Sequence, residues 1–185
     1  MSEFEKDKEK LRQLILRDAY FREKIILSSG KESDYYIDAR RVTLHPEGAY
    51  LCGKIILAMV KDDKIDAIGG PTLGADPMVG AIGVLSLEAK RPVNTFIIRK
   101  APKPHGKQQQ IEGPLLQSSH RIVLIDDVAT TGKAFLESLD VLEKMGLKPV
   151  KAIVIVDRNE GAREALKARG CLLESIFDIK EIHRS

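Results

Sequence analysis

Two adjacent carboxylates and a threonine-rich turn form the stretch of this chain whose residues could most clearly do chemistry. Asp126 and Asp127 follow a short apolar run at 122–125, and a turn of small residues at 129–132 comes next. The backbone N–H groups of such a turn, leading into a helix, bind anions such as phosphate, and threonine hydroxyls add donors. The carboxylates would repel a second phosphate but accept hydrogen bonds from sugar hydroxyls. The pattern therefore predicts a ligand with a phosphate at one end and a diol at the other, such as a ribose 5-phosphate.

A buried strand and a helix are expected to position these groups. The run at 122–125 has no polar face, which indicates a strand buried on both sides of a parallel sheet, and an amphipathic pattern predicts a helix from about 133 to 145. Taken alone, the acid pair would be a solvated strand end beside a helix cap, but the full order of strand, acids, turn and helix is more specific. A Walker A loop is excluded, because alanine follows Gly132-Lys133 and Asp127 stands at the first glycine position. A response regulator would carry its acid pair near the start of the chain.

A basic segment at 99–107 is the second candidate for chemistry. Its prolines and Gly106 disfavour a helix, and with the glutamines that follow it predicts a long polar loop that buries almost nothing. Such a loop is either a solvated surface loop or a lid that brings positive charge to an anion. Four cations and a histidine occur in it: Arg99, Lys100, Lys103, His105 and Lys107.

Three further segments could complete a site. Apolar runs around a Ser/Gly/Lys turn at 25–38 predict a hairpin that carries Tyr35 and Tyr36. The glycine-rich loop 70–77 is expected at the sheet edge where open α/β proteins bind ligands, although an ordinary strand-to-helix turn would look similar. Arg158 ends a predicted strand, where it could pair with its neighbour Asp157 or bind an anion.

The remaining elements predict alternating helices and strands. We expect an amphipathic helix over about 3–17 and further helices at about 46–61, 74–90 and 160–169. We expect further strands at 65–69, 93–98, 149–156 and 171–177, followed by a short polar tail.

Length and composition indicate one soluble domain. The chain has 185 residues and a formal net charge of +3 without long blocks of one sign, so no nucleic-acid partner is indicated. Cys52 and Cys171 lack metal-ligand spacing and are expected to be buried. The charged N-terminus does not resemble a signal peptide and no apolar run could span a bilayer, which predicts a cytoplasmic protein with no membrane partner.

The stretch RIVLIDDVATTGKAF at 121–135 closely resembles the phosphoribosyl-diphosphate (PRPP) signature of the type I phosphoribosyltransferases. In that family the acid pair binds the ribose hydroxyls and the turn surrounds the 5′-phosphate. The resemblance implies one α/β domain over 1–185, with a central, mostly parallel sheet flanked by helices. It implies a core over about 46–177 and a small hood formed by about 1–45 and the C-terminal tail.

Three more stretches resemble the orotate phosphoribosyltransferases of this family. RKAPKPHG resembles their catalytic loop, R-K-x-x-K-x-H-G, which adenine and hypoxanthine enzymes lack. SSGKESDYYIDAR resembles their hood, and GGPTLGADP resembles the diphosphate loop of one subgroup. Ser28 and Leu73 depart from the family, since many members carry lysine at these positions. The resemblance implies transfer of the phosphoribosyl group from PRPP to orotate.

The resemblance also implies residue roles. Lys103, His105, Asp126 and Asp127 would be catalytic, and orotate would contact Tyr35, Tyr36, Thr130 and Arg158. Mg²⁺ would be the cofactor, held mainly by PRPP and water without direct protein ligands, and a homodimer would share its lids between subunits. A phosphoribosyltransferase for another nucleobase and a non-catalytic PRPP-sensing regulator are the alternatives. PRPP would contact Arg99, Lys100, Lys103, His105, Asp126, Asp127, Val128, Ala129, Thr130, Thr131, Gly132, Lys133 and Ala134.

Overall fold

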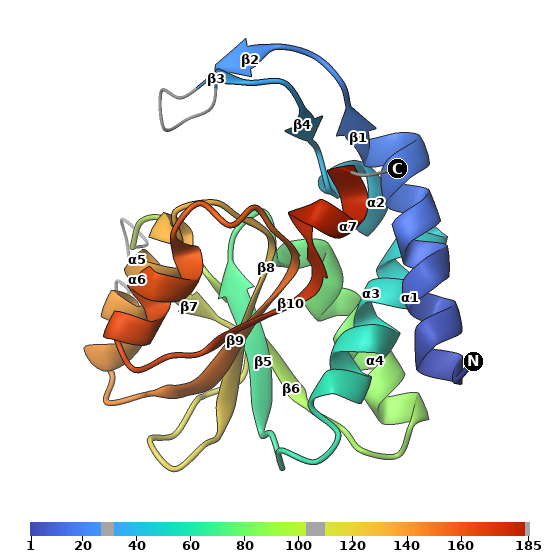
Figure 1. The fold of residues 1–185 in the computed structure, drawn as a ribbon. Coiled ribbons are helices and arrows are strands. Elements are labelled where there is room, and N and C mark those ends of the chain that lie inside the picture. Colours follow the sequence, from blue (N-terminus) through green and yellow to red (C-terminus); the bar gives the residue numbers. More distant parts are fainter. Residues whose placement is uncertain (27–31, 103–109, 184–185) are drawn as a thin grey trace.

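A six-stranded sheet forms the centre of the molecule (Figure 1). The computed structural model describes residues 1–26, 32–102 and 110–183. The strand order is β10-β9-β8-β5-β6-β7; all neighbours pair in parallel except β7, which runs antiparallel to β6. The strands are β5 (Ala67–Pro71), β6 (Asn94–Ile98), β7 (Ile111–Glu112), β8 (Ile122–Ala129), β9 (Pro149–Asp157) and β10 (Leu173–Asp178).

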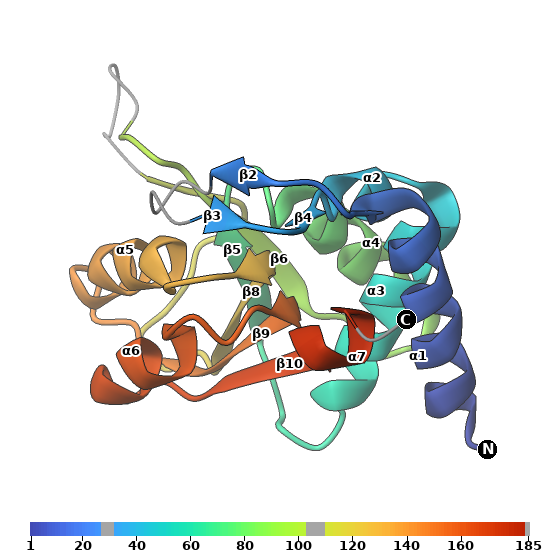
Figure 2. The same ribbon diagram turned by 45° about the horizontal axis from the view of Figure 1, so that its top comes forward.

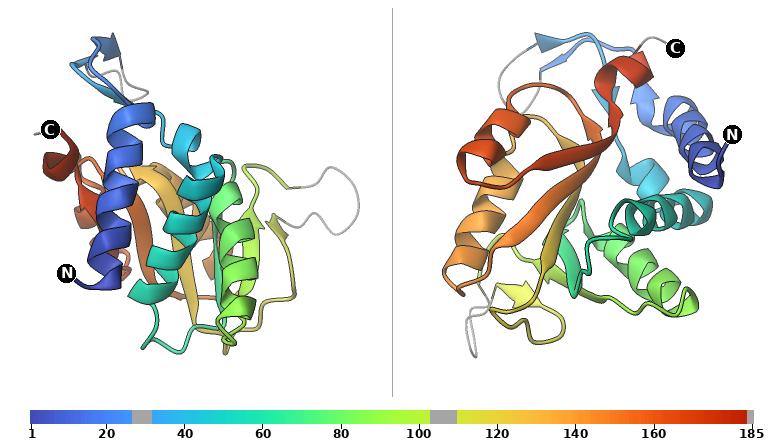
Figure 3. Two further views of the ribbon diagram at one scale, coloured as in Figure 1. Left: turned by 90° about the vertical axis from the view of Figure 1, so that its right-hand side faces the viewer. Right: turned by 60° about the horizontal axis from the view of Figure 1, so that its bottom comes forward.

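Helices cover both faces of this sheet (Figure 3). On one face, α1 packs against α3 and α3 packs against α4, while α5 and α6 lie on the other. The helices are α1 (Glu3–Leu14), α3 (Pro46–Met59), α4 (Asp76–Glu88), α5 (Lys133–Glu143) and α6 (Ala162–Ala168).

The apolar run of β8 explains why both faces need cover. Val123 and Ile125 belong to the core cluster beneath α1, α3 and α4, whereas Ile122 and Leu124 belong to the cluster beneath α5. Successive side chains of a strand point to opposite faces, so a continuous apolar run is buried only between two helix layers. The predicted α/β fold with a mostly parallel sheet is confirmed.

A small hood crosses the carboxyl ends of the strands (Figure 2). It consists of two two-stranded pairs, β1 with β4 and β2 with β3, and a π-helical turn links it to α1. The hydroxyl of Tyr20 lies 2.7 Å from Nδ1 of His183, which connects the hood to the last helix. The elements are the π-helix Ile15–Ala19, β1 (Tyr20–Phe21), β2 (Ile25–Ile26), β3 (Glu32–Ser33), β4 (Tyr36–Ile37), α2 (Arg40–Thr43) and α7 (Ile179–His183).

Several predicted elements need correction. The predicted hairpin at 25–38 is confirmed in part, since β2 and β3 pair antiparallel, but its second apolar run, β4, pairs with β1 and not with β2. The predicted polar tail contains α7, whose Ile179 and Ile182 are buried. The polar loop after the basic segment contains β7, which adds an antiparallel edge to the sheet.

Candidate active site

The site lies where the order of the sheet reverses. From the neighbours β5 and β8, the chain adds β6 on one side and β9 and β10 on the other. Ligands of open α/β sheets bind at the carboxyl ends of the strands at such a switch point. The loop after β5 and the turn after β8 therefore lie at the same edge of the sheet.

The acid pair lies inside β8 and not after it. Asp126 pairs in register with Val154, and Val128 with Val156, so β8 continues to Ala129. Oδ1 of Asp126 accepts the N–H of Asp127 at 2.9 Å, and Oδ1 of Asp127 accepts the N–H of Val128 at 2.8 Å. The strand and these backbone bonds fix both carboxylates before any ligand binds.

Burial makes the acid pair unusual. Asp126 is only 8% exposed, and this burial, together with the charge of Asp127, raises its pKa well above the ordinary value. Burial also raises the pKa of Asp127, while the N–H of Val128 and the charge of Arg40 oppose the rise. Within the described ranges neither carboxylate forms an ion pair, so donors or cations from a ligand would be bound favourably.

The loop after β5 packs directly against the acids. A Cβ atom at Gly74 would overlap Oδ1 of Asp126. Only glycine therefore allows the backbone to approach this closely. Thr72 donates to Oδ2 of Asp76 at 2.7 Å, which fixes the loop at the first turn of α4.

A cavity of about 300 Å³ brings part of the predicted site together. Asp126, Asp127, Val128 and Ala134 line it from β8 and α5, and Lys100 lines it from the segment after β6. The other walls are the hood segment from Tyr36 to Arg40 and the loop from Pro71 to Gly74. A neighbouring hollow of about 610 Å³ shares Asp38, Arg40 and Leu73 with it. A third hollow, of about 580 Å³, lies at the amino ends of the strands and contains none of the predicted site residues.

The turn between β8 and α5, where the sequence predicts a phosphate, depends on a glycine. Gly132 has φ +81° and ends the turn where α5 begins at Lys133. A side chain at Gly132 would also press on Leu166 and Ala162. Thr130 is partly buried and Thr131 is exposed, so the turn, which begins at Ala129, is accessible to a ligand. The Lys133 side chain is 82% exposed and lies 3.8 Å from Glu137.

Arg158 is held beneath the hood. Its guanidinium lies 4.6 Å from the ring centroid of Tyr35, and its Nη2 donates to Oγ of Ser33 at 3.2 Å. Its Nε lies 2.9 Å from Oε1 of Glu160. The alternative pairing with Asp157 is not realised, because that carboxylate lies 2.6 Å from Nε of Arg163.

The two hood tyrosines lie in different parts of the site. The ring of Tyr35 stacks on Tyr20 at 5.8 Å and meets Arg158, and burial raises the pKa of Tyr35. Tyr36 stacks on Phe21 at 6.4 Å and lines the acid cavity. Tyr35 therefore belongs with the arginine and Tyr36 with the acid pair.

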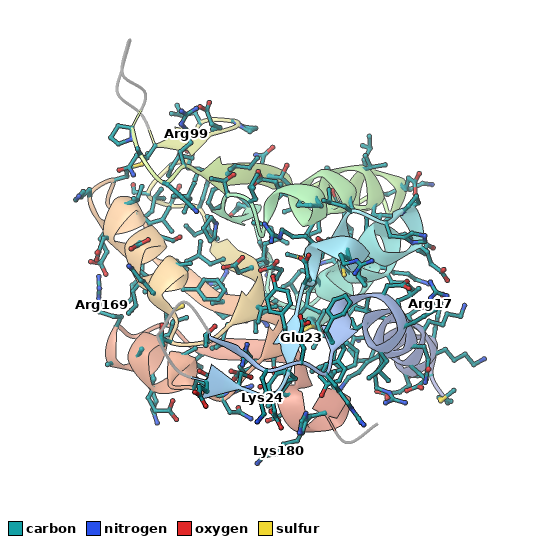
Figure 4. The ribbon with its side chains drawn as sticks, turned by 90° about the horizontal axis from the view of Figure 1, so that it is seen from above. Arg17, Glu23, Lys24, Arg99, Arg169 and Lys180 are labelled. Carbon is teal, nitrogen blue, oxygen red and sulfur yellow. The ribbon has the colours of Figure 1, made fainter. Side chains whose placement is uncertain are left out.

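The basic segment is only partly described. Nη1 of Arg99 lies 3.3 Å from Glu112 on β7, and Figure 4 shows Arg99 on the side of the molecule opposite Lys180. Arg99 does not line the cavity that contains Lys100. Lys103 and His105, like Ser28 in the hood, lie outside the described residues.

Sequence reasoning gave no role to Asp38, Arg40 or Glu160, and it included Gly74 only as part of the loop 70–77. Asp38 and Arg40 directly follow the tyrosines, and their charge beside an aromatic pair was the available signal. The contact between Gly74 and Asp126 spans two strands, and no local pattern indicates it.

Other site types find little support in the described part of the chain. No group of three or more His, Cys, Asp or Glu side chains there could hold a metal ion. No helix among the described residues is long and apolar enough to cross a membrane. Burial raises the pKa of Cys52 to about 12 and that of Cys171 to about 11, which makes both thiols poor nucleophiles.

Known proteins are similar to this chain in fold and in sequence. The phosphoribosyl transferase domain family matches residues 40–184. The orotate phosphoribosyltransferase of Aquifex aeolicus is 44% identical over 156 residues, 84% of this chain and 85% of that protein. The orotate phosphoribosyltransferase of Nostoc sp. is 39% identical, over 95% of this chain and 84% of its own length.

Solved structures of orotate phosphoribosyltransferases are also similar to this chain. The orotate phosphoribosyltransferase of Mycobacterium tuberculosis in complex with Fe(III) dicitrate has a TM-score of 0.84 and 35% identity, covering 95% of this chain and 98% of that one. The same enzyme in complex with PRPP has a TM-score of 0.80 and 32% identity, covering 96% and 99%. The chain belongs to the phosphoribosyltransferase family, and within it to the orotate phosphoribosyltransferases.

Proposed function

We propose that this protein transfers the 5-phosphoribosyl group of PRPP to orotate, giving orotidine 5′-monophosphate and diphosphate. The cavity that joins the acid pair of β8 to the loop after β5 and the start of α5 carries this proposal. It offers acceptors for a diol beside a turn for a phosphate, as a phosphoribosyl group requires. The names of the relatives support orotate as the acceptor.

The walls of the cavity give PRPP one orientation. The 5′-phosphate would bind the N–H groups and hydroxyls of the turn from Ala129 to Ala134, at the N-terminus of α5. The ribose hydroxyls would donate to Asp126 and Asp127, whose carboxylates form no ion pair among the described residues. The C1 diphosphate would then point towards the loop 72–74 and Lys100.

The base would lie on the other side of C1. Arg158 has the planar donor set that suits a carboxylate, and Tyr35, Tyr36 and Thr130 would border the pyrimidine ring. Orotate brings a deprotonated nitrogen that is already nucleophilic, so no covalent enzyme intermediate is needed. As the C1–O bond breaks, positive charge grows on the ribose, and Asp126 and Asp127 would stabilise it.

The leaving diphosphate needs cations. Arg99 and Lys100 begin the basic segment, and Lys103 and His105 would complete a lid that stabilises the growing negative charge and excludes water. Lys103 is the candidate for the transition-state contact.

Mg²⁺ is the proposed cofactor, and the donor set fits it. The acid pair is buried and rich in oxygen, and its burial raises the pKa of both carboxyls. Asp126 and Asp127 would hold the cation indirectly, through ribose hydroxyls and water. When bound, Mg²⁺ would supply positive charge to the diphosphate oxygens.

A homodimer with shared lids is also proposed. Large apolar side chains are exposed on α4 and beside it, with Val84 61%, Leu87 69% and Leu73 62% exposed. A second copy could cover such a surface. Both cysteines are free and buried, which suits the reducing cytoplasm and supports a cytoplasmic location.

The test is the loss of orotate absorbance in the presence of PRPP and Mg²⁺. Wild type should turn over, and Lys103→Ala should lose roughly a factor of 100 to 1000 in kcat, the range for one transition-state donor. Lys107→Ala is the matched control, since it removes a cation from the same segment and should retain activity. PRPP binding without orotate turnover would contradict the proposal, and turnover of adenine or hypoxanthine instead would indicate another base.

A further inference from the structure

Arg40 lies in the PRPP cavity without a role in the reaction as described above. It is the first residue of α2, just after the hood strand β4 (Figure 2), and it lines the 300 Å³ cavity together with Gly74, Lys100 and Asp127. Its side chain is 46% exposed, and its Nε lies 3.4 Å from Oδ1 of Asp38. This distance is long for an ion pair, so the guanidinium interacts only weakly with Asp38.

The charges of the cavity show what this arginine could bind. Among the described residues that line it, Asp38, Asp126 and Asp127 are acidic, while Arg40 and Lys100 are basic. PRPP carries several negative charges, so the acids alone would repel it. The charge of Arg40 already acts on the acid pair, because it opposes the rise in the pKa of Asp127.

The geometry of the reaction indicates which part of PRPP would contact Arg40. An attacking base and a leaving diphosphate occupy opposite sides of C1. Arg158 and Tyr35 form the proposed base side, whereas Arg40 and the loop 72–74 line the cavity with the acids. The loop itself brings Thr72, Leu73 and Gly74, none of which is a cation.

Arg41 provides an internal contrast. Its guanidinium lies 5.0 Å from the ring centroid of Phe21, and it lines the neighbouring hollow but not the acid cavity. The two arginines are adjacent and carry the same charge, and only Arg40 reaches the cavity.

We infer that Arg40 binds the diphosphate of PRPP and the diphosphate product, opposite the base side of the site. This assignment rests on the proposed function. It makes Arg40 a substrate-binding residue supplied by the hood, so the hood contributes to the leaving-group side as well as to the base side.

The experiment compares Arg40→Gln with Arg41→Gln in the full chain. Calorimetric titration with PRPP, with inorganic diphosphate and with orotidine 5′-monophosphate, each with Mg²⁺, separates the contacts, because the last ligand has no diphosphate. Arg40→Gln should weaken PRPP and diphosphate by about ten- to a hundredfold, as for one lost hydrogen bond between charged groups. Binding of orotidine 5′-monophosphate should stay within about threefold, and Arg40→Lys should restore part of the loss. Arg41→Gln should bind all three ligands like wild type.

Unchanged affinity of Arg40→Gln for PRPP and diphosphate would overturn the assignment. Equal weakening of all three ligands would also overturn it, since that result indicates a structural role. If Arg40→Gln does not fold by circular dichroism, Arg40→Ala takes its place, and wild-type affinity for PRPP and diphosphate in that variant would refute the contact. Failure of wild type to bind PRPP would instead refute the proposed function, and this inference with it.

Discussion

Asp126 and Asp157 are both buried aspartates near the carboxyl ends of neighbouring parallel strands, and their surroundings are opposite. Asp157, on β9, is fully buried, accepts the N–H of Asn159 at 2.9 Å and lies 2.6 Å from Nε of Arg163. Asp126, on β8, is almost as buried but faces a second carboxylate, and the described residues give it no ion-pair partner.

The difference separates a structural carboxylate from a functional one. A buried charge is costly unless it is paired, so Asp157 is compensated within the fold. The charge of Asp126 is left for a ligand to compensate. Burial alone therefore does not identify a site residue, whereas burial without a partner does.

The largest expected effect comes from removing the partner of Asp157. Arg163→Met should lower the free energy of unfolding by about 3 kcal/mol, the lower end for a broken buried pair, because the arginine side chain is 43% exposed. It would also remove the donors to Leu173 and Ser175. Urea denaturation measures the change.

Arg169→Met is the matched control for this measurement. Arg169 pairs with Asp140 and Glu143, both about half exposed, so its loss should lower the free energy of unfolding far less than the loss of Arg163. Equal losses in the two variants would contradict the view of Asp157 as a buried, compensated charge.

Asp126→Asn should act in the opposite direction on stability. A carboxyl whose pKa is raised by folding destabilises the fold once the pH exceeds its ordinary value of 3.8, and the penalty grows as the pH rises towards the folded pKa. The variant should therefore melt at a higher temperature than wild type at pH 7, and the gain should vanish near pH 4. Scanning fluorimetry of the ligand-free protein between pH 4 and 8 checks this.

The same variant should lose function. One hydrogen bond to a charged group is worth about 1.5–3 kcal/mol, so kcat/KM for PRPP should fall by about ten- to a hundredfold. A variant that is both less stable at pH 7 and fully active would show that Asp126 is structural, like Asp157.

The smallest effect is expected at Asp127. It is less buried than Asp126, and the N–H of Val128 and the charge of Arg40 favour its ionised form. Asp127→Asn should raise the melting temperature at pH 7 by less than Asp126→Asn does, in the same fluorimetric experiment. A larger rise would mean that Asp127 carries the uncompensated charge of the pair.

The sequence predicted the long elements and the position of the acid pair at the sheet edge because their signals are local. The apolar run of β8 and the amphipathic pattern of α5 each depend on neighbouring residues. The hood was predicted less well, since strands of two residues have no periodicity and their pairing is set by the tertiary structure.

Contacts between distant segments could not be read from the sequence either. The pairing of Asp157 with Arg163 and the packing of Gly74 on Asp126 depend on the order of the strands. The extension of β8 through Asp126 follows from its register with β9. This register cannot be predicted from the tendency of acidic residues to follow strands.

The side chain of Arg158 has lost most of its conformational freedom before any ligand binds. The ring of Tyr35, the hydroxyl of Ser33 and the carboxylate of Glu160 hold its guanidinium, and its side chain is only 6% exposed. Ordering a free arginine costs up to about 2 kcal/mol of conformational entropy. Arg158 has already lost this entropy on folding, so the binding of a carboxylate there is weakened less by ordering of the side chain. A ligand of the half-exposed Arg40 must still immobilise that side chain when it binds.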